Sequence, residues 1–178
     1  MKKVEHGKTF DRNAANPPAF EIFHNTVTEG YPEHWHTAIE IIMPTRGEYE
    51  VVVGKDSYNL KEGDIIMINS GVVHGMRFVS QGERIVMLVE PGCVENQEEM
   101  ETIFLRLPAI YFKKEDEEDP FYLFLRSQIL ELVREYDNEG AVMTHRICTG
   151  LKELFSEFGR KGFSDANAQN TFGAMKQQ

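Results

Sequence analysis

The chain has 178 residues, of which 41% are hydrophobic and 27% charged, and its formal net charge is -10. This length fits one domain with a small appendage, and the composition is that of an ordinary globular protein. The acidic balance, with no lysine- or arginine-rich patch, excludes a chain that grips nucleic-acid phosphates by itself.

We expect no targeting or membrane-spanning segment in this sequence. The first residues, MKKVEHGKTFDRN, are not followed by an apolar run, so we expect no signal peptide. The longest apolar runs are too short to span a bilayer, so we expect no membrane partner. Cys93 and Cys148 lack the spacing of a disulfide framework, which favours reduced thiols and a cytoplasmic protein.

Up to Pro91, short runs of β-branched and apolar residues alternate with turn signals at regular spacing. This pattern is typical of an all-β sandwich or barrel, and the turns PTRG and GKD have hairpin chemistry. No glycine-rich phosphate loop and no long helical period support an α/β nucleotide-binding fold. The pattern predicts strands over residues 19–28, 39–43, 48–53, 57–60, 65–68, 72–79 and 84–89.

Beyond Pro91 the hydrophobic period becomes helical. Asn96 followed by Glu99 is a capping-box signal, and the helix it opens should stop before Pro108. The acidic connector 113–119 is more typical of a solvated loop than of a binding site.

Asp119 before Pro120 predicts the start of a further helix, with an N-cap and a proline in the first turn. A second helix should follow and end at Gly159 and Gly162. We predict that the two helices form an antiparallel hairpin. Their apolar stripes are Phe121, Leu125, Ile129, Leu132, Val133 and Tyr136, and then Ile147, Leu151, Leu154, Phe155 and Phe158.

The segment EHWHTAIE carries the densest cluster of candidate ligands. On an extended strand His34 and His36 share a face, with Cα atoms about 6.6 Å apart. Glu40 would lie about 13 Å beyond His36 on a straight strand, so it joins the histidines only if the chain bends at Thr37–Ile39. With His74 from a later strand, the set suits one ion of Zn, Ni, Fe or Mn. A histidine in a strand is, however, most often an ordinary hydrogen-bonded polar group.

The spacing is more specific than the histidine pair. The pattern H-x-H-x3-E-x6-G runs from His34 to Gly47, and a second cluster contains Gly63, Gly71 and His74. These clusters resemble the two motifs of the cupin superfamily, which implies a small antiparallel jelly-roll barrel. The resemblance implies four metal-ligand positions, which are His34, His36, Glu40 and His74.

The match to the cupin motifs is incomplete. The glycine expected five residues before the first histidine is missing, and Gly30 stands closer to it. Asn69 replaces the usual proline of the second motif, and Phe78 replaces the usual asparagine.

A narrower resemblance covers most of the chain. The segments GEYEVVVGKDSYNL, KEGD and INSGVVH, followed by EPGCVENQEEM and the two helices, resemble the N-terminal effector domain of AraC-type bacterial transcription regulators. The resemblance implies a barrel that binds a small effector, such as a sugar or another small metabolite, and helices that dimerise. It also implies a DNA-binding domain of two helix-turn-helix units, which this chain lacks.

These resemblances divide the chain into three parts. We expect a cupin-like effector barrel over residues 1–95 and a helical dimerisation and linker region over residues 96–162. Residues 163–178 would be a flexible tail leading to the absent DNA-binding domain.

Two other functions compete with the regulator. A free-standing metal-dependent cupin enzyme, such as a dioxygenase or isomerase, is the alternative because the ligand set is complete. A metal-free binding protein is the third. The two amphipathic helices favour a regulator, so we do not expect an enzyme.

Five further residues on the predicted strands are candidates for a ligand pocket. Phe20, Ile22, His24, Met76 and Phe78 are predicted to line an apolar ligand pocket, although core packing is the default role of such residues. Arg46, in a turn, is more often solvated than placed to guard the barrel mouth against an anionic ligand.

The apolar stripes of the two predicted helices indicate that the chain forms a homodimer. Ile129 and Leu151 are predicted as the outermost stripe positions, at the interface of a two-fold homodimer.

Overall fold

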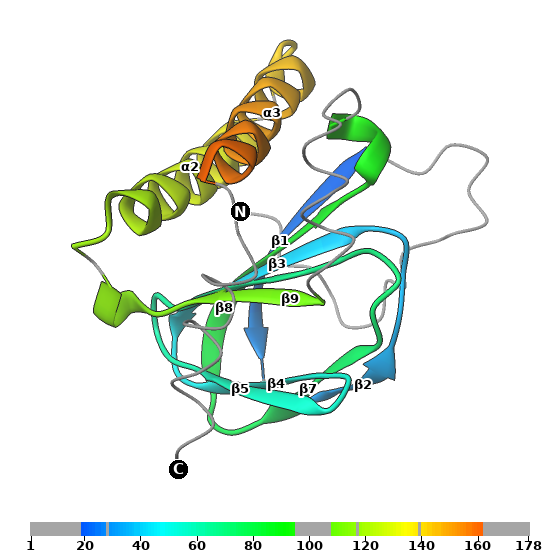
Figure 1. Cartoon of the computed structure of the whole chain (residues 1–178). Helices are drawn as coiled ribbons and strands as arrows, with labels where there is room; N and C mark the ends of the chain where they lie inside the picture. The colour runs from blue at the N-terminus through cyan, green and yellow to red at the C-terminus, as the bar shows by residue number, and fades with distance from the viewer. Residues whose placement is uncertain (1–18, 28, 95–107, 117, 139, 162–178) are drawn as a thin grey trace.

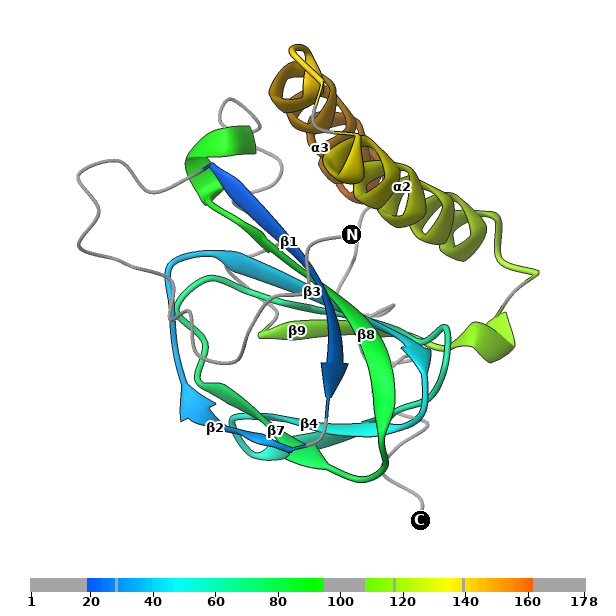
Figure 2. The same cartoon turned by 180° about the vertical axis from the view of Figure 1, so that it is seen from behind.

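The computed structural model describes residues 19–161, apart from residues 28, 95–107, 117 and 139. Two antiparallel sheets face each other, and two helices lie over the outer face of one sheet, as seen from opposite sides in Figures 1 and 2. The predicted antiparallel barrel followed by a helical hairpin is therefore confirmed. None of the described helices is both long enough and apolar enough to cross a membrane.

The first sheet has five strands and the second has four, and every pairing is antiparallel. In spatial order the first sheet contains β1 (Phe20–Val27), β8 (Gly82–Val89), β3 (Ile39–Arg46), β6 (Ile65–Ile68) and β9 (Ala109–Phe112). In spatial order the second contains β2 (Tyr31–His34), β7 (His74–Phe78), β4 (Tyr49–Val53) and β5 (Asp56–Leu60).

The side chains of the five-stranded sheet alternate between two separate cores, because successive residues of a strand point to opposite faces. On β3, Ile39, Ile41 and Met43 belong to the core that contains the helices. Ile42 belongs to the core between the two sheets, which is the barrel interior. A strand buried on both faces is apolar at nearly every position, which explains the apolar residues of IEIIM on either side of Glu40.

Positive φ angles fall at the turns that close the barrel. Gly54 has φ 58° in the tight turn between β4 and β5, a conformation that costs glycine little. Gly63 has φ 87°, and a Cβ there would approach the Lys114 side chain to 2.8 Å.

The helices begin and pack as their sequences predict. The helix α2 (Pro120–Asp137) is capped by Asp119, whose Oδ1 accepts a hydrogen bond of 2.8 Å from the backbone N–H of Phe121. Tyr122 donates its hydroxyl hydrogen to the carbonyl oxygen of Gly63 at 2.8 Å, which fixes α2 to the loop before β6. The helix α3 (Met143–Lys161) passes Gly159 and ends directly before Gly162, the second of the two glycines predicted to end it.

Residues 109–112 correct the predicted division of the chain. They form β9, which pairs with β6, so part of the predicted helical region 96–162 belongs to the barrel. The run AIYF is too short to show the alternation of a strand, and it lies between Pro108 and the charged connector 113–119. A short 3-10 helix, η1 (Pro91–Val94), follows β8. The predicted helix that starts at Asn96 and the predicted tail 163–178 lie outside the described residues.

Two predicted interface residues are also corrected. Ile129 and Leu151 are both 0% exposed and lie in the core between the helices and the five-stranded sheet. The stripes that contain them face the sheet, because the sheet presents a large apolar surface that has to be covered. They are therefore not available to a partner subunit.

The two cysteines lie at the contact between η1 and α3. The Sγ atoms of Cys93 and Cys148 are 3.5 Å apart, and both cysteines are free thiols. Burial and the neighbouring thiol raise the pKa of Cys93 to about 12, so it stays protonated at neutral pH. That the two thiols are reduced in the protein stays a prediction from the sequence.

We expect Ile129→Ala to lower the free energy of unfolding by about 2–5 kcal/mol, because it opens a cavity in a closely packed core. Urea unfolding followed by circular dichroism measures this change. The control Leu123→Ala, at a side chain 50% exposed on the same helix, should change stability by less than about 0.5 kcal/mol. An Ile129 variant of unchanged stability would contradict the placement of this side chain.

Candidate metal centre

The fold brings together four side chains from three strands and a bend. His34 is the last residue of β2, and its register partner is His74, the first residue of β7. The chain then leaves β2, passes His36, bends at Thr37 and Ala38, and enters the other sheet at Ile39. The predicted bend is confirmed, and it carries Glu40 back toward the histidines.

The donor atoms of these residues form a compact cluster. One donor atom from each of His34, His36, Glu40 and His74 lies within 4.8 Å of the other three. Oε2 of Glu40 is 2.9 Å from Nε2 of His36 and 2.8 Å from Nε2 of His74. The ring centroids of His34 and His74 are 4.4 Å apart. The predicted convergence is therefore present, at one end of the barrel interior.

Backbone carbonyl groups orient all three imidazoles in the same way. Because a carbonyl oxygen only accepts hydrogen bonds, each Nδ1 carries its hydrogen, and Nε2 of a neutral ring carries the lone pair. A metal-ligating histidine is usually oriented by such a bond from its other nitrogen. The three bonds join Nδ1 of His34 to Pro32 O at 3.1 Å, Nδ1 of His36 to Ala38 O at 2.9 Å, and Nδ1 of His74 to Val72 O at 2.8 Å.

The cluster requires a positive charge at its centre. With Nδ1 protonated, neutral rings of His36 and His74 would both direct a lone pair at the same oxygen of Glu40. That arrangement is repulsive, and either a proton on an Nε2 atom or a bound cation relieves it. A divalent ion satisfies all four donors at once.

The pKa values have the same cause. Burial raises the pKa of Glu40, but the hydrogen bonds from His36 and His74 outweigh it and lower that pKa to about 2. Burial lowers the pKa of His74, but the hydrogen bond and charge of Glu40 raise it above the ordinary 6.5. Burial and the nearby His74 lower the pKa of His34. At neutral pH the cluster thus offers a carboxylate together with at least one neutral imidazole.

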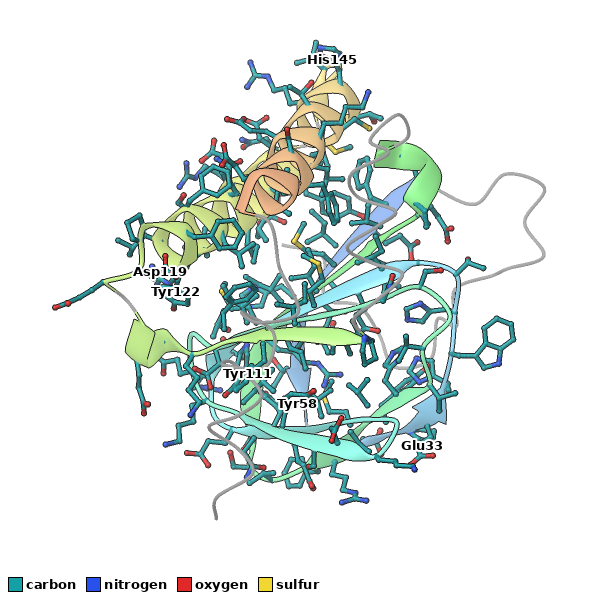
Figure 3. The ribbon with its side chains drawn as sticks, in the orientation of Figure 1. Glu33, Tyr58, Tyr111, Asp119, Tyr122 and His145 are labelled. Atoms are coloured by element: carbon teal, nitrogen blue, oxygen red, sulfur yellow. The ribbon has the colours of Figure 1, made fainter. Side chains whose placement is uncertain are left out.

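The donor chemistry fits a first-row transition ion. Three imidazole nitrogens and one carboxylate oxygen suit Zn, Ni, Fe or Mn, and such sites often leave positions open for a further ligand. His145 takes no part, because it lies at the far tip of the helical hairpin (Figure 3).

Three of the predicted pocket residues lie on the other face of the sheet. Phe20 and Ile22 belong to the core that faces the helices, and the Phe20 ring centroid is 6.2 Å from that of Tyr136. His24 pairs across the sheet with Ile85 of the same core, and directly opposed residues share a face. Their predicted place in the barrel interior is wrong, because the helices cover the apolar face of β1.

The other two predicted pocket residues have different environments. Met76 is buried in the barrel interior, as predicted. Phe78 is 45% exposed. Both line a cavity of about 380 Å³ that contains none of the four clustered residues. This cavity is lined by Gly30, Tyr31, Pro32, Glu33, Val52, Gly75, Met76, Arg77 and Phe78.

The comparisons with known proteins agree with this fold. Residues 25–90 match the family model described as a cupin domain, a region that includes all four clustered residues. No curated protein matches the sequence.

Solved structures are similar at low identity. Apo ToxT from Vibrio cholerae is 11% identical with a TM-score of 0.53, and the match covers 82% of this chain and 58% of that one. A conserved protein of unknown function from Streptococcus pyogenes is 18% identical with a TM-score of 0.37, covering 40% and 63%. Oxalate decarboxylase of Bacillus subtilis is 18% identical with a TM-score of 0.38, covering 40% and 21%. This chain thus spans less than two thirds of each of these proteins.

We expect the protein to bind one divalent transition ion per chain when it is loaded with Zn²⁺, Ni²⁺, Mn²⁺ or Fe²⁺ and then desalted. His74→Ala removes a ligand, so it should weaken binding by roughly a hundredfold or more, since changes to outer-shell residues already cost 10–100-fold. Elemental analysis and titration calorimetry measure both quantities. His145→Ala, a control histidine far from the cluster, should bind like the wild type, and well under one ion per chain after loading would contradict the assignment.

We expect the stability of the metal-free protein to be greatest in a defined pH window. The lowered pKa of Glu40 gives stability that is present above its ordinary value of 4.5 and is lost as the pH falls toward 2. The raised pKa of His74 gives stability that is present below 6.5 and is lost as the pH rises through the folded-state pKa. The contribution of this pair should therefore peak between pH 4.5 and 6.5.

Thermal unfolding of chelator-treated protein across pH 3 to 9 tests this window, in roughly half-unit steps that resolve a single titration. Glu40→Gln should flatten the profile at both ends, whereas Glu62→Gln, at an exposed carboxylate, should not. A Glu40 variant with the wild-type profile would show that the pair does not set the window.

Proposed function

We propose that this chain is a cytoplasmic small-molecule sensor, the effector-binding part of an AraC-type transcription regulator. The strand β3 carries this proposal, because it connects the barrel interior to the helices. Its second residue, Glu40, holds the histidine cluster, while Ile39 and Ile41 on either side pack in the core beneath α2 and α3. A ligand that moves Glu40 would therefore also move Ile39 and Ile41, against which the helices pack.

The resemblance in sequence and the extent of the fold support the same proposal. The match to ToxT covers 82% of the chain and so extends well beyond the cupin-like region 25–90. The net charge of -10 agrees with a division of labour in which another domain contacts DNA phosphates.

The proposal includes a homodimer formed through the helices, with a contact surface different from the predicted one. Because Ile129 and Leu151 are buried, only the outward face of the hairpin is free to meet a partner subunit. Among the described residues of the two helices, Leu123 is the large apolar side chain that is exposed, at 50%. Arg126, Glu131 and Arg134 also lie on exposed positions of α2. A contact made through this face would be mainly polar and therefore weak.

A metal-dependent cupin enzyme is the second candidate. The observation in its favour is the complete donor set of three imidazoles and one carboxylate around a single point. Such a set can activate a bound substrate as well as hold an effector.

We expect an effector to change the helices as well as the barrel. A thermal-shift screen of sugars and other small metabolites should yield a compound that stabilises the protein. That compound should slow amide hydrogen exchange severalfold in β3 and also in α2 and α3, and should shift the monomer–dimer balance in sedimentation. Glycerol at the same concentration is the control.

Two results would contradict the sensor. Protection confined to the barrel, with unchanged sedimentation, would show that the helices receive no signal. Consumption of the compound by metal-loaded protein, followed by mass spectrometry, would favour the enzyme instead.

A further inference from the structure

A buried arginine lies in the barrel wall, on β8, which lies between β1 and β3 in the five-stranded sheet. Arg84 is on β8, where Ile85, Met87 and Val89 belong to the helix-facing core and Val86 faces the barrel interior. By the alternation of the strand, Arg84 points inward with Val86. It is only 8% exposed, which is unusual for an arginine.

Polar atoms around this arginine have no protein partner. Neither Nε nor Nη1 of Arg84 forms a hydrogen bond with any described residue, and both atoms are buried. Its Cζ atom lies 5.6 Å from the centroid of the Tyr49 ring, whose buried hydroxyl also forms no hydrogen bond within the described part of the chain. Asn25, which pairs across the sheet with Arg84, has a buried Oδ1 in the same condition. Buried polar groups are almost always paired, so three neighbouring exceptions call for an explanation.

The described carboxylates inside the barrel are engaged elsewhere. Oε2 of Glu40 lies within 2.9 Å of Nε2 of both His36 and His74. Asp64 accepts from Tyr111 at 2.6 Å, and from the backbone N–H groups of Lys61 and Lys114 at 2.9 and 2.8 Å. At the rim, Glu83 is 3.2 Å from Arg46. An unpaired buried cation is costly, so its partner is best supplied by a molecule that enters the barrel.

We infer that the barrel interior binds a small organic carboxylate and that Arg84 is the anchor for its negative group. A guanidinium matches a carboxylate with two parallel hydrogen bonds, and Nε with one terminal nitrogen forms such a pair. The Tyr49 hydroxyl supplies a further donor. This inference rests on the proposed sensing function and specifies the chemical class of the effector.

The anion site is separate from the histidine cluster. On the paired strands β3 and β8, Glu40 is opposite Leu88, and Pro44 is opposite Arg84. Four residues separate the two levels along the backbone, which is about 13 Å. The charge of Glu40 still acts on the Arg84 guanidinium, but no hydrogen bond joins them. Between them the interior wall is apolar, with Ile42, Val51, Met76 and Val86. A carboxylate with an apolar body therefore suits this end of the barrel.

Titration calorimetry with matched pairs of acids and amides tests the inference. The probes are acetate, hexanoate, octanoate and benzoate, each against its neutral carboxamide, with wild-type protein at one fixed metal loading. At least one acid should bind tenfold or more tightly than its amide. Arg84→Met should abolish that preference, Arg84→Lys should keep part of it, and Arg126→Met, at an exposed arginine on α2, should not change it.

Thermal unfolding without any ligand supplies a second measurement. If the guanidinium is reserved for a ligand, Arg84→Met should raise the melting temperature by a few degrees, because it removes an uncompensated buried charge. A lower melting temperature that Arg84→Lys restores would overturn the inference in favour of a structural cation.

The binding results separate this inference from the sensor itself. Amides that bind as tightly as their acids, or an acid preference that survives in Arg84→Met, would overturn the anion site and leave a sensor of neutral compounds. Absence of binding by every acid would also overturn it. The helix protection described above depends on none of these probes, so the sensor fails or stands on that measurement.

Discussion

The carboxylate of Glu40 links the parts of this molecule. Its Oε2 atom lies 2.9 Å from Nε2 of His36 and 2.8 Å from Nε2 of His74, which come from a bend and from the opposite sheet. Its backbone lies in β3, where the adjacent residues Ile39 and Ile41 belong to the core between the sheet and the helices. One residue thus contacts groups from both sheets and lies between residues of the helix-facing core.

The barrel interior holds charge at two levels, and each level is arranged differently. At the histidine end, the carboxylate has protein partners, and a proton or an ion completes the balance. At the other end, Nε and Nη1 of Arg84 have no hydrogen-bond partner among the described residues, and the charge of Glu40 acts on the guanidinium only from a distance. A fold that keeps such groups gives up stability, and binding sites are where proteins commonly do so. Two polar ends with an apolar stretch between them describe a site for an elongated molecule with one acidic group.

Part of the site was predictable from the sequence because it depends on local geometry. The histidine pair, the necessary bend before Ile39 and the return of Glu40 follow from the length of an extended residue and were confirmed by the structure. The inward position of Arg84 could also have been read from the alternation of RIVMLV. What the sequence did not reveal is that Arg84 is unpaired, because its neighbours Asn25 and Tyr49 come from distant strands.

The sequence by itself determined the strands with clear turns, the cap of α2 at Asp119, the two amphipathic helices and the residues of the histidine cluster. The strands, the cap and the helices depend on contacts within a few residues along the chain, whereas His74 joined the predicted cluster through the resemblance to the cupin motifs. Only the tertiary structure decided that Ala109–Phe112 joins the barrel and that Phe20 and Ile22 face the helices. It also decided that Ile129 and Leu151 are buried. An apolar stripe shows that a face must be covered, but which surface covers it depends on how separate elements meet in space.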